Sequence, residues 1–354
     1  MKIQGQRARQ DIVRLSHRGL DSTVLRREVL RTLKRVIPID AAFFATTDPA
    51  TLLFTSAVVD DVLSRQTALF LQDEFLEDDA NKFAELTRRR GHVSSLLEST
   101  RRVLAASWRY REILEPAALG DELRAALMVD GACWGVLCLH RERARVGFSP
   151  AEQAFLARVA PHIAIGLRAA VTRDAVETSL EHDGPGLVLL TDDLSIIAMS
   201  AVAERLIQDL DGIDSQASGL PWAVTSVAAR LRELEMGARD ASEPRVRVRT
   251  RGGEWLAVHA TRMAGGETRQ IAVILDRAQP MEIAPLIVQT YGLSPRESEI
   301  TRLIAQAFTT SEISATCHIT ADTVQDHCKS IFEKVGVRSR RELVAQLYER
   351  HFRH

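Results

Sequence analysis

A row of polar side chains recurs at helical spacing between residues 321 and 334. The row comprises Asp322, Gln325, Asp326, Lys329 and Glu333, at offsets of three and four residues. Such offsets place side chains on one stripe of an α-helix. The opposite stripe is apolar and comprises Val324, Cys328, Ile331, Phe332 and Val335. Amide, carboxylate and ammonium groups on one stripe can reach the edges of bases in a major groove, so the spacing predicts a helix that reads a duplex.

Helix-start signals surround this segment and would hold it in place. Ser294-Pro295-Arg296-Glu297 combines an N-cap, a proline at the first helical position and a glutamate that returns to the cap. The spacing recurs at Thr309–Glu312 and Ser339–Glu342, and Thr320 can cap a helix beginning at Ala321. These signals predict four short helices joined by tight turns. The second and third have the proportions of a helix-turn-helix.

The same residues carry a family resemblance. Leu293–Glu297, Ile319–Val324 and Ile331–Val337, with Ser339-Arg340, look like the DNA-binding domain of LuxR/GerE-type bacterial regulators. The resemblance implies a four-helix fold and double-stranded DNA as the partner. It places Gln325, Asp326 and Lys329 where family members contact bases or phosphates. The full set of expected DNA-contacting residues is Asp322, Thr323, Gln325, Asp326, Lys329, Arg338, Arg340 and Arg296.

The chain departs from the family pattern in ways that affect DNA affinity. The family usually has basic residues at Ser311 and Gln325, and glycines at Ala307 and His318. Residues 291–354 contain nine Lys plus Arg and eight Asp plus Glu, a net charge of +1. Phosphate neutralisation supplies most non-specific affinity, so one copy should bind weakly, and two copies on adjacent half-sites are expected. Two roles remain open for Asp326: it could accept a hydrogen bond from a cytosine amino group, or it could repel phosphate.

Composition bounds the rest of the chain. Its 354 residues suffice for two or three domains, and a net charge of −1 argues against a general polyanion binder. No apolar stretch approaches the roughly 18 to 20 residues that span a bilayer, and no signal-peptide pattern is seen. A cytoplasmic protein without a membrane partner is expected. Residues 1–36 hold ten Lys plus Arg against three acids, which indicates basic amphipathic helices or, alternatively, a membrane-surface or transit segment.

Residues 21–170, after a basic extension at 1–20, are expected to form a first sensor domain. The pattern predicts helices at 23–37, 62–76 and 81–90, strands at 41–46 and 52–58, and a long helix from Ser149. Asp130-Gly131 predicts a hairpin between strands 122–129 and 133–140. This order resembles a GAF domain.

Residues 171–280, including a preceding linker helix, are expected to form a second sensor domain, followed by the tail at 281–354. Strands at 186–191 and 195–199, helices at 200–210 and 221–235, and three further strands resemble a PAS domain. The fold class expected is therefore α+β multidomain. Arg245, Arg247 and Arg249 alternate with valines, which indicates a half-buried strand rather than a nucleic-acid stripe. Small residues around Gly166 on the long helix could pair with a second copy or pack on the domain's own sheet.

Catalytic signatures are missing from the sequence. There is no nucleophile elbow, phosphate-binding glycine loop or zinc spacing, so no catalytic residue, metal or cofactor is expected. His140, His162 and His259 are expected to be structural. Cys133 and Cys138, five apart in a strand, should point to opposite faces. Trp134 and Trp255 are weak candidates to line a pocket for an unidentified small molecule, with core packing as the alternative.

These patterns together favour a dimeric bacterial transcription regulator rather than an enzyme. The GAF-like and PAS-like domains would couple a signal to promoter binding by the tail, with DNA, a small-molecule effector and RNA polymerase as partners. One alternative is a sensing scaffold whose tail has lost most DNA affinity and contacts proteins instead. A second alternative is an enzyme that uses a cofactor bound in a sensor domain.

Overall fold

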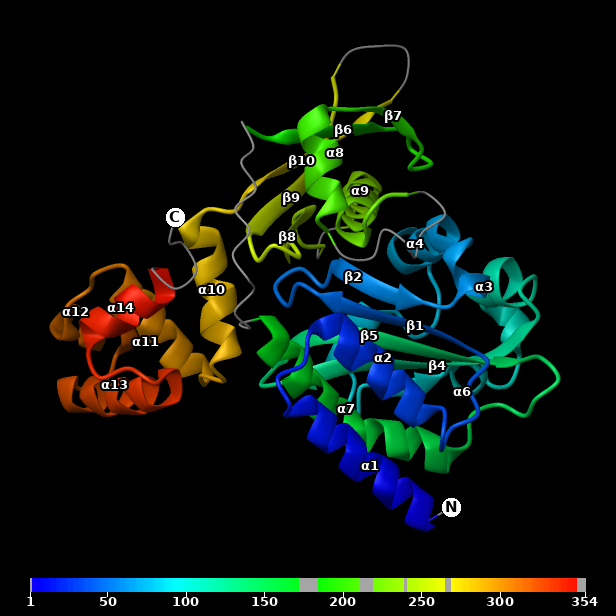
Figure 1. Ribbon diagram of the computed structural model, residues 1–354, viewed down its shortest axis with the longest axis horizontal. Coiled ribbons are helices and arrows are strands. Elements are labelled where there is room, and N and C mark those ends of the chain that lie inside the picture. Colours follow the sequence, from blue (N-terminus) through cyan, green and yellow to red (C-terminus); the bar gives the residue numbers. More distant parts are fainter. Residues whose placement is uncertain (1, 172–183, 211–218, 239–240, 265–268, 349–354) are drawn as a thin grey trace. The chain divides into compact units, whose positions relative to one another are not determined.

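The computed structural model describes residues 2–171, 184–210, 219–238, 241–264 and 269–348 (Figure 1). The chain forms two compact units, Met1–Arg277 and Ala278–His354. The first unit contains two five-stranded antiparallel sheets, and the second is helical. The mixed helix-and-sheet class expected from the sequence is confirmed.

The first sheet has the strand order β2-β1-β5-β4-β3. Its strands are β1 Ala41–Thr47, β2 Phe54–Val59, β3 Val93–Ser95, β4 Leu119–Val129 and β5 Ala132–Glu142. The helices around it are α1 Lys2–Ser16, α2 Ser22–Leu33, α3 Asp61–Ser64, α4 Thr67–Leu76, α5 Phe83–Arg88, α6 Leu96–Ser99 and α7 Pro150–Val171. A short 3-10 turn, η1 Leu104–Ala106, and a π-turn, η2 Tyr110–Leu114, precede β4.

The expected hairpin joins β4 to β5. Asp130 and Gly131 have φ values of 50° and 76°, the left-handed pair that a two-residue turn of this type requires. Met128 pairs with Cys133 but Leu127 pairs with Gly135, so Trp134 is the extra residue of a β-bulge. The bulge moves the pairs from Leu127 to Glu122 by one position.

Helix α7 covers one face of this sheet, and α1 and α2 pack against α7 (Figure 1). A Cβ atom at Gly166 would come within 2.7 Å of Leu25 Cδ2 and 2.9 Å of the Ser16 Cα. The small residue at this position therefore serves packing within the chain. Helix α1, expected to lie outside the GAF-like domain, buries Ala8 and Ile12 and is part of the same unit.

Among the described residues, α7 is the one helix long and apolar enough to cross a membrane by length and composition. This finding corrects the expectation that no stretch approaches that length. Its apolar side chains, including Leu156, Val159 and Ile163, are buried inside the unit. A core helix passes such a test as easily as a membrane span.

The second sheet has the order β7-β6-β10-β9-β8. Its strands are β6 Gly186–Leu190, β7 Ile196–Met199, β8 Arg245–Arg249, β9 Trp255–Arg262 and β10 Ile271–Arg277, accompanied by helices α8 Ala201–Gln208 and α9 Trp222–Glu235. Helix α9 packs on β8, β9 and β10 of the second sheet (Figure 1). It also packs on β2 and α4, which belong to the first sheet and the helices around it; below, each sheet with its helices is called a domain. It therefore joins the cores of the two sheets.

Several element boundaries differ from those expected. The helix expected at 62–76 is split into α3 and α4, and the one at 81–90 is shortened to α5 because Asn81 has a left-handed φ of 62°. Strand β4 begins at Leu119, three residues early. The expected linker helix is described only to Val171, and the rest of it lies outside the described residues.

The second unit consists of α10 Pro280–Thr290, α11 Pro295–Ala305, α12 Thr310–Cys317, α13 Ala321–Val335 and α14 Arg340–Tyr348. Capping boxes are formed at Ser294 and Thr309, and the Thr320 hydroxyl accepts from the Thr323 amide at 3.2 Å. At α14, the Ser339 hydroxyl accepts from Glu342 N, but the Glu342 carboxylate returns to the amide of Arg338. The predicted caps thus set the starts of α11, α12, α13 and α14.

Candidate functional site

Helix α13 separates a buried seam from an exposed stripe. Val324, Ile331 and Val335 are buried. The residues expected to face DNA from this helix are all exposed: Asp322, Thr323, Gln325, Asp326 and Lys329. Within the second unit, the side chains that could reach a groove are therefore on one accessible face.

Glu297 of α11 anchors α13 through Ser330 and Lys334, away from the exposed stripe. Its carboxylate accepts from the Ser294 amide, the Ser330 hydroxyl and the Lys334 ammonium, each at 2.6 Å. Burial would raise its pKa, but the bonds from Lys334, Ser330 and Ser294 outweigh burial and lower that pKa to about 2. One buried carboxylate therefore closes the α11 cap and anchors two positions of α13.

The positive charge on the exposed stripe is engaged within the helix. Lys329 Nζ lies 3.0 Å from Asp326 Oδ1, and the two side chains are 77% and 74% exposed. A pair this exposed is worth about 0–1 kcal/mol, because solvent screens it. Lys329 can therefore exchange Asp326 for a phosphate at little cost.

The three arginines expected at the DNA interface have different environments. Arg296 donates to Glu299 at 2.6 Å and to the carbonyl of Cys317, so it satisfies a carbonyl at the end of α12. Arg338 is exposed and Arg340 is half-buried. Arg338 is thus the one of the three most open to a phosphate, and the structure holds Arg296 within the fold.

The two positions where the family usually has glycine adopt left-handed backbone. Ala307 has φ 65° and His318, at the end of α12, has φ 53°. Non-glycine residues pay a steric cost in this region. The turns on either side of α12 therefore hold non-glycine residues in a strained backbone conformation.

A second candidate site is a small cavity in the first unit. Its volume is about 20 Å³, room for about one water molecule. Its lining joins apolar and polar groups: Phe43, Val59, Leu63, Gln66, Thr67, Phe70, Arg109, Ile113, Leu114, Glu122, His140 and Trp222. Trp134 and Trp255 are buried elsewhere in the core and do not line it. The tryptophan that lines the cavity is instead Trp222. Its position could not be inferred from the sequence, because it lies on α9, a helix that packs on the second sheet and reaches the first.

Trp222 belongs to a contact between the two sheets. Its ring lies 5.1 Å from that of Phe43 and 5.9 Å from that of Phe54, both edge-on. Ser226, one turn later, donates to the carbonyl of Phe54 at 3.0 Å. The first domain's aromatic core is therefore completed by a helix of the second domain.

An ion pair reinforces this contact. Arg247 of β8 donates to both carboxylate oxygens of Asp48, at 2.8 and 2.5 Å. Arg249 donates to the carbonyls of Gly253 and Val171. The alternating arginines thus lie on a half-buried strand, as expected, and make contacts inside the unit.

A buried ionic network borders the cavity. Arg109 contacts Asp73 at 2.6 Å and Glu122 at 2.7 Å, and Arg124 contacts Glu74 at 2.7 Å. Burial raises the pKa of Asp73 to about 6 despite the two arginines. Burial would also raise the pKa of Glu122, but Arg109 and Arg124 outweigh it and lower that pKa to about 2. Burial lowers the pKa of His140 to about 4, so its imidazole is neutral at pH 7.

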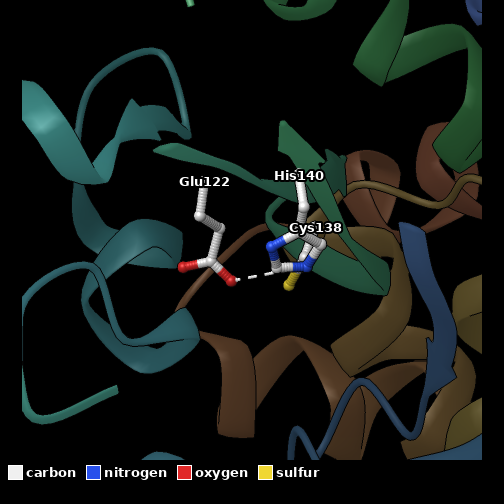
Figure 2. Close-up of side chains that lie close together, drawn as sticks. All are labelled: Glu122, Cys138 and His140. Carbon is white, nitrogen blue, oxygen red and sulfur yellow. Dashed lines mark ion pairs between the residues drawn. The ribbon is translucent and has the colours of Figure 1, made fainter. Parts of the chain in front are cut away.

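Three ligand-type side chains converge beside this network. Glu122, Cys138 and His140 are buried, and their donor atoms lie within 4.8 Å of one another (Figure 2). Sequence reasoning missed the group, because an unbulged hairpin would place Glu122 opposite Leu139 rather than His140. The bulge also corrects the expectation for Cys133 and Cys138, which belong to the same core cluster rather than to opposite faces.

Comparison with known proteins agrees with the fold of the first sheet and its helices and with the fold of the helical tail. Residues 292–347 match the family of bacterial regulatory proteins of the LuxR type, and residues 11–167 match the GAF domain. No curated protein matches the chain. The GAF match begins inside α1, in line with the packing of that helix.

Solved structures give weaker likenesses. The VqsR ligand-binding domain of Pseudomonas aeruginosa is 18% identical, with 48% of this chain and 98% of that chain covered and a TM-score of 0.32. Escherichia coli SdiA is 12% identical over 96% of this chain and 94% of that chain, with a TM-score of 0.31. The VqmA–ligand–DNA complex from Vibrio cholera is 17% identical, covering 49% and 84%, with a TM-score of 0.22. Scores this low say nothing about function.

A GAF domain joined to a C-terminal helix-turn-helix is the organisation of a sensor-coupled regulator. The chain carries a LuxR-type helix-turn-helix domain at residues 292–347 and a GAF domain at residues 11–167.

Proposed function

We propose that the protein is a transcription regulator that binds promoter DNA as a homodimer through α13 when a signal is sensed by its N-terminal unit. The observation that carries the proposal is the exposed polar stripe of α13, fixed from behind by Glu297. Asp322, Thr323, Gln325, Asp326 and Lys329 would face the groove, and Arg338 and Arg340 would meet the backbone. Arg296 would act only after leaving Glu299 and Cys317.

The weak charge of the tail supports two copies on adjacent half-sites. Residues 291–354 carry a net charge of +1, and Lys329 is already paired with Asp326. Few phosphate contacts per copy mean low affinity and a modest salt slope. Two tails on one duplex would multiply the weak affinities through their high effective concentration.

Signal sensing is assigned to the first unit, where the cavity and the domain contact coincide. Trp222 lines the cavity from α9, so a molecule that enters must displace or repack a side chain of the second domain. A signal shifts an equilibrium only if it binds one arrangement better than another. Repacking of Trp222 supplies such a difference between the sensor domains.

The second domain is proposed to be PAS-like. Two strands, helices and three strands in a sheet of order β7-β6-β10-β9-β8 support this assignment. The proposal places the protein in the cytoplasm, with a small-molecule effector and RNA polymerase as partners, and assigns it no catalytic step. The four cysteines, all free, agree with a reducing compartment.

A sensing scaffold is the competing proposal, favoured by the Asp326–Lys329 pair. The experiment selects duplexes from a random pool with the full-length protein, then titrates the selected duplex at several salt concentrations. Regulation predicts a selected sequence, with half-sites spaced by about one helical turn. Asp326→Asn then separates its two roles: stronger binding to every duplex indicates phosphate repulsion, and lost preference at one base pair indicates readout. No complex with any duplex at low ionic strength would favour the scaffold.

A further inference from the structure

The hairpin β4–β5 brings three metal-ligand side chains to one buried point. Glu122 lies directly opposite His140 across the two strands, and Cys138 precedes His140 by two residues, so all three share a face. Their exposed fractions are 1%, 3% and 0%. Glu122 Oε1 lies 3.9 Å from His140 Nε2. Figure 2 shows the carboxylate, thiol and imidazole pointing toward one another.

The donor atoms have unused capacity. Glu122 Oε2 accepts from Arg109 at 2.7 Å and contacts Arg124 Nε at 3.1 Å, but Glu122 Oε1 has no hydrogen-bond partner among the described residues. His140 Nδ1 is likewise without one in the described part of the chain. Buried polar atoms in proteins are nearly always satisfied, so atoms without a partner on two side chains of one buried cluster require an explanation.

The charges of the surrounding network favour a cation. Two guanidiniums, those of Arg109 and Arg124, contact four carboxylates, and none of the six side chains is more than 6% exposed. The carboxylates are those of Asp73, Glu74, Asp79 and Glu122. With all six ionised the group carries a net charge of −2, four negative against two positive. A divalent cation would offset this excess and leave a net charge of −1 once Cys138 is a thiolate, four carboxylates and one thiolate against two guanidiniums and the cation.

The protonation states also suit a metal. Arginine neighbours keep the pKa of Glu122 at about 2, and burial keeps that of His140 at about 4, so a carboxylate and a neutral imidazole stand ready. Burial raises the pKa of the Cys138 thiol well above its ordinary value. Binding would therefore release one proton from Cys138 as the metal–thiolate bond forms.

We propose that Glu122, Cys138 and His140 form a binding site for a divalent transition metal, with zinc as the best match. A sulfur, nitrogen and oxygen donor set suits zinc, whose bonds of about 2.0–2.3 Å require donors within roughly 3.3–3.7 Å of one another. The donor atoms now lie up to 4.8 Å apart. Side-chain movements of on the order of 1 Å would bring them to the separations that zinc requires. Three protein ligands leave one position, and Glu122 and His140 both line the cavity. An effector carrying an oxygen, nitrogen or sulfur donor could complete the shell from there.

Cobalt(II) provides a visible probe of this site. Untagged full-length protein, stripped by a chelator and kept reduced, is titrated with Co²⁺ and then with Zn²⁺. The proposal predicts saturation at one Co²⁺ per chain, a thiolate-to-cobalt charge-transfer band in the near ultraviolet, and displacement by Zn²⁺. This readout does not involve DNA, so it can fail while the proposed regulation stands.

Matched serine variants locate the binding. Cys138→Ser should abolish the charge-transfer band and weaken Co²⁺ binding at least about tenfold, whereas Cys133→Ser, also a buried thiol of β5, should leave both unchanged. His140→Gln, which keeps Cys138, should weaken affinity similarly and covers the case in which Cys138→Ser does not fold. Absence of saturable binding to the folded protein, or an unchanged band in Cys138→Ser, would overturn the proposal.

Discussion

The carboxylate of Glu297 lies 2.6 Å from the ammonium of Lys334, and the same oxygen closes the N-cap of its own helix through the Ser294 amide. Lys334 is a basic side chain of α13, and this ion pair directs its ammonium toward α11. Glu297 itself is 4% exposed. The pair therefore holds α13 in position and adds no charge to its exposed polar stripe.

Glu297→Gln should destabilise the helix-turn-helix by about 1–3 kcal/mol, because an uncharged amide weakens the charge-assisted bonds from Lys334 and Ser294. DNA affinity should fall with it, as α13 loses two of its anchors. Thermal unfolding of the full-length protein checks the first effect. The control is Glu299→Gln, whose ion pair with Arg296 is partly exposed and should contribute less than about 1 kcal/mol. Equal losses in both variants would contradict the anchoring role.

Lys329→Ala should weaken DNA binding and lower the salt slope by about one if the ammonium meets a phosphate. If it reads a base instead, discrimination at one position should drop by about 1–3 kcal/mol. Titrations against matched and single-mismatch duplexes at three salt concentrations distinguish these outcomes. Stability should be unaffected, since the Asp326–Lys329 pair is highly exposed. An unchanged isotherm would remove Lys329 from the interface.

The sequence predicted the helical tail well because its signals are local. Ser294, Thr309 and Thr320 cap neighbouring backbone amides within three residues, and periodicity alone separates the seam of α13 from its stripe. The Asp130-Gly131 turn is local in the same sense. Such features need no knowledge of tertiary structure.

The cavity and the ligand-type cluster depend on long-range geometry that the sequence does not display. Register across β4 and β5 follows from the bulge at Trp134, and a shift of one residue changes every pairing partner. Trp222 reaches Phe43 only because α9 packs on both domains. Arg296 looked like a surface cation, but the fold places the Cys317 carbonyl within its reach.

Ala307→Gly should stabilise the tail by about 0.5–1 kcal/mol. The alanine holds φ 65° between α11 and α12, where a Cβ is sterically penalised by about 1–2 kcal/mol. The greater flexibility of glycine in the unfolded chain removes part of that gain. Chemical denaturation of the two proteins measures the difference. Ala315→Gly, at an exposed position inside α12, should instead cost about 1 kcal/mol, and stabilisation there would show that local strain is not the cause.

Trp222→Ala should uncouple the two sheets of the first unit. Removing this fully buried ring from its contacts with Phe43 and Phe54 should cost about 3–5 kcal/mol and enlarge the cavity. Calorimetry should then resolve separate unfolding transitions for the two sheets where the parent shows one. Trp134→Ala serves as the matched control, since it removes a buried indole that does not line the cavity. A split transition in the control as well would mean that general destabilisation, not lost coupling, separates the domains.

His140→Gln should change how stability depends on pH. Burial lowers the pKa of His140 from 6.5 to about 4, so below pH 6.5 the unfolded chain takes up the proton first. The stability that neutral His140 contributes is thus present above pH 6.5 and lost as pH falls toward 4. Asp73, whose pKa is raised to about 6, acts in the opposite sense, because its contribution to stability is lost as pH rises through 6. Asp73 is present in both proteins, so its contribution cancels in their difference. The unfolding free energy of His140→Gln minus that of the parent, measured with a chelator present, should therefore rise by up to about 3 kcal/mol between pH 6.5 and 4. A difference that stays flat across this range would show that His140 titrates alike in the folded and unfolded chains.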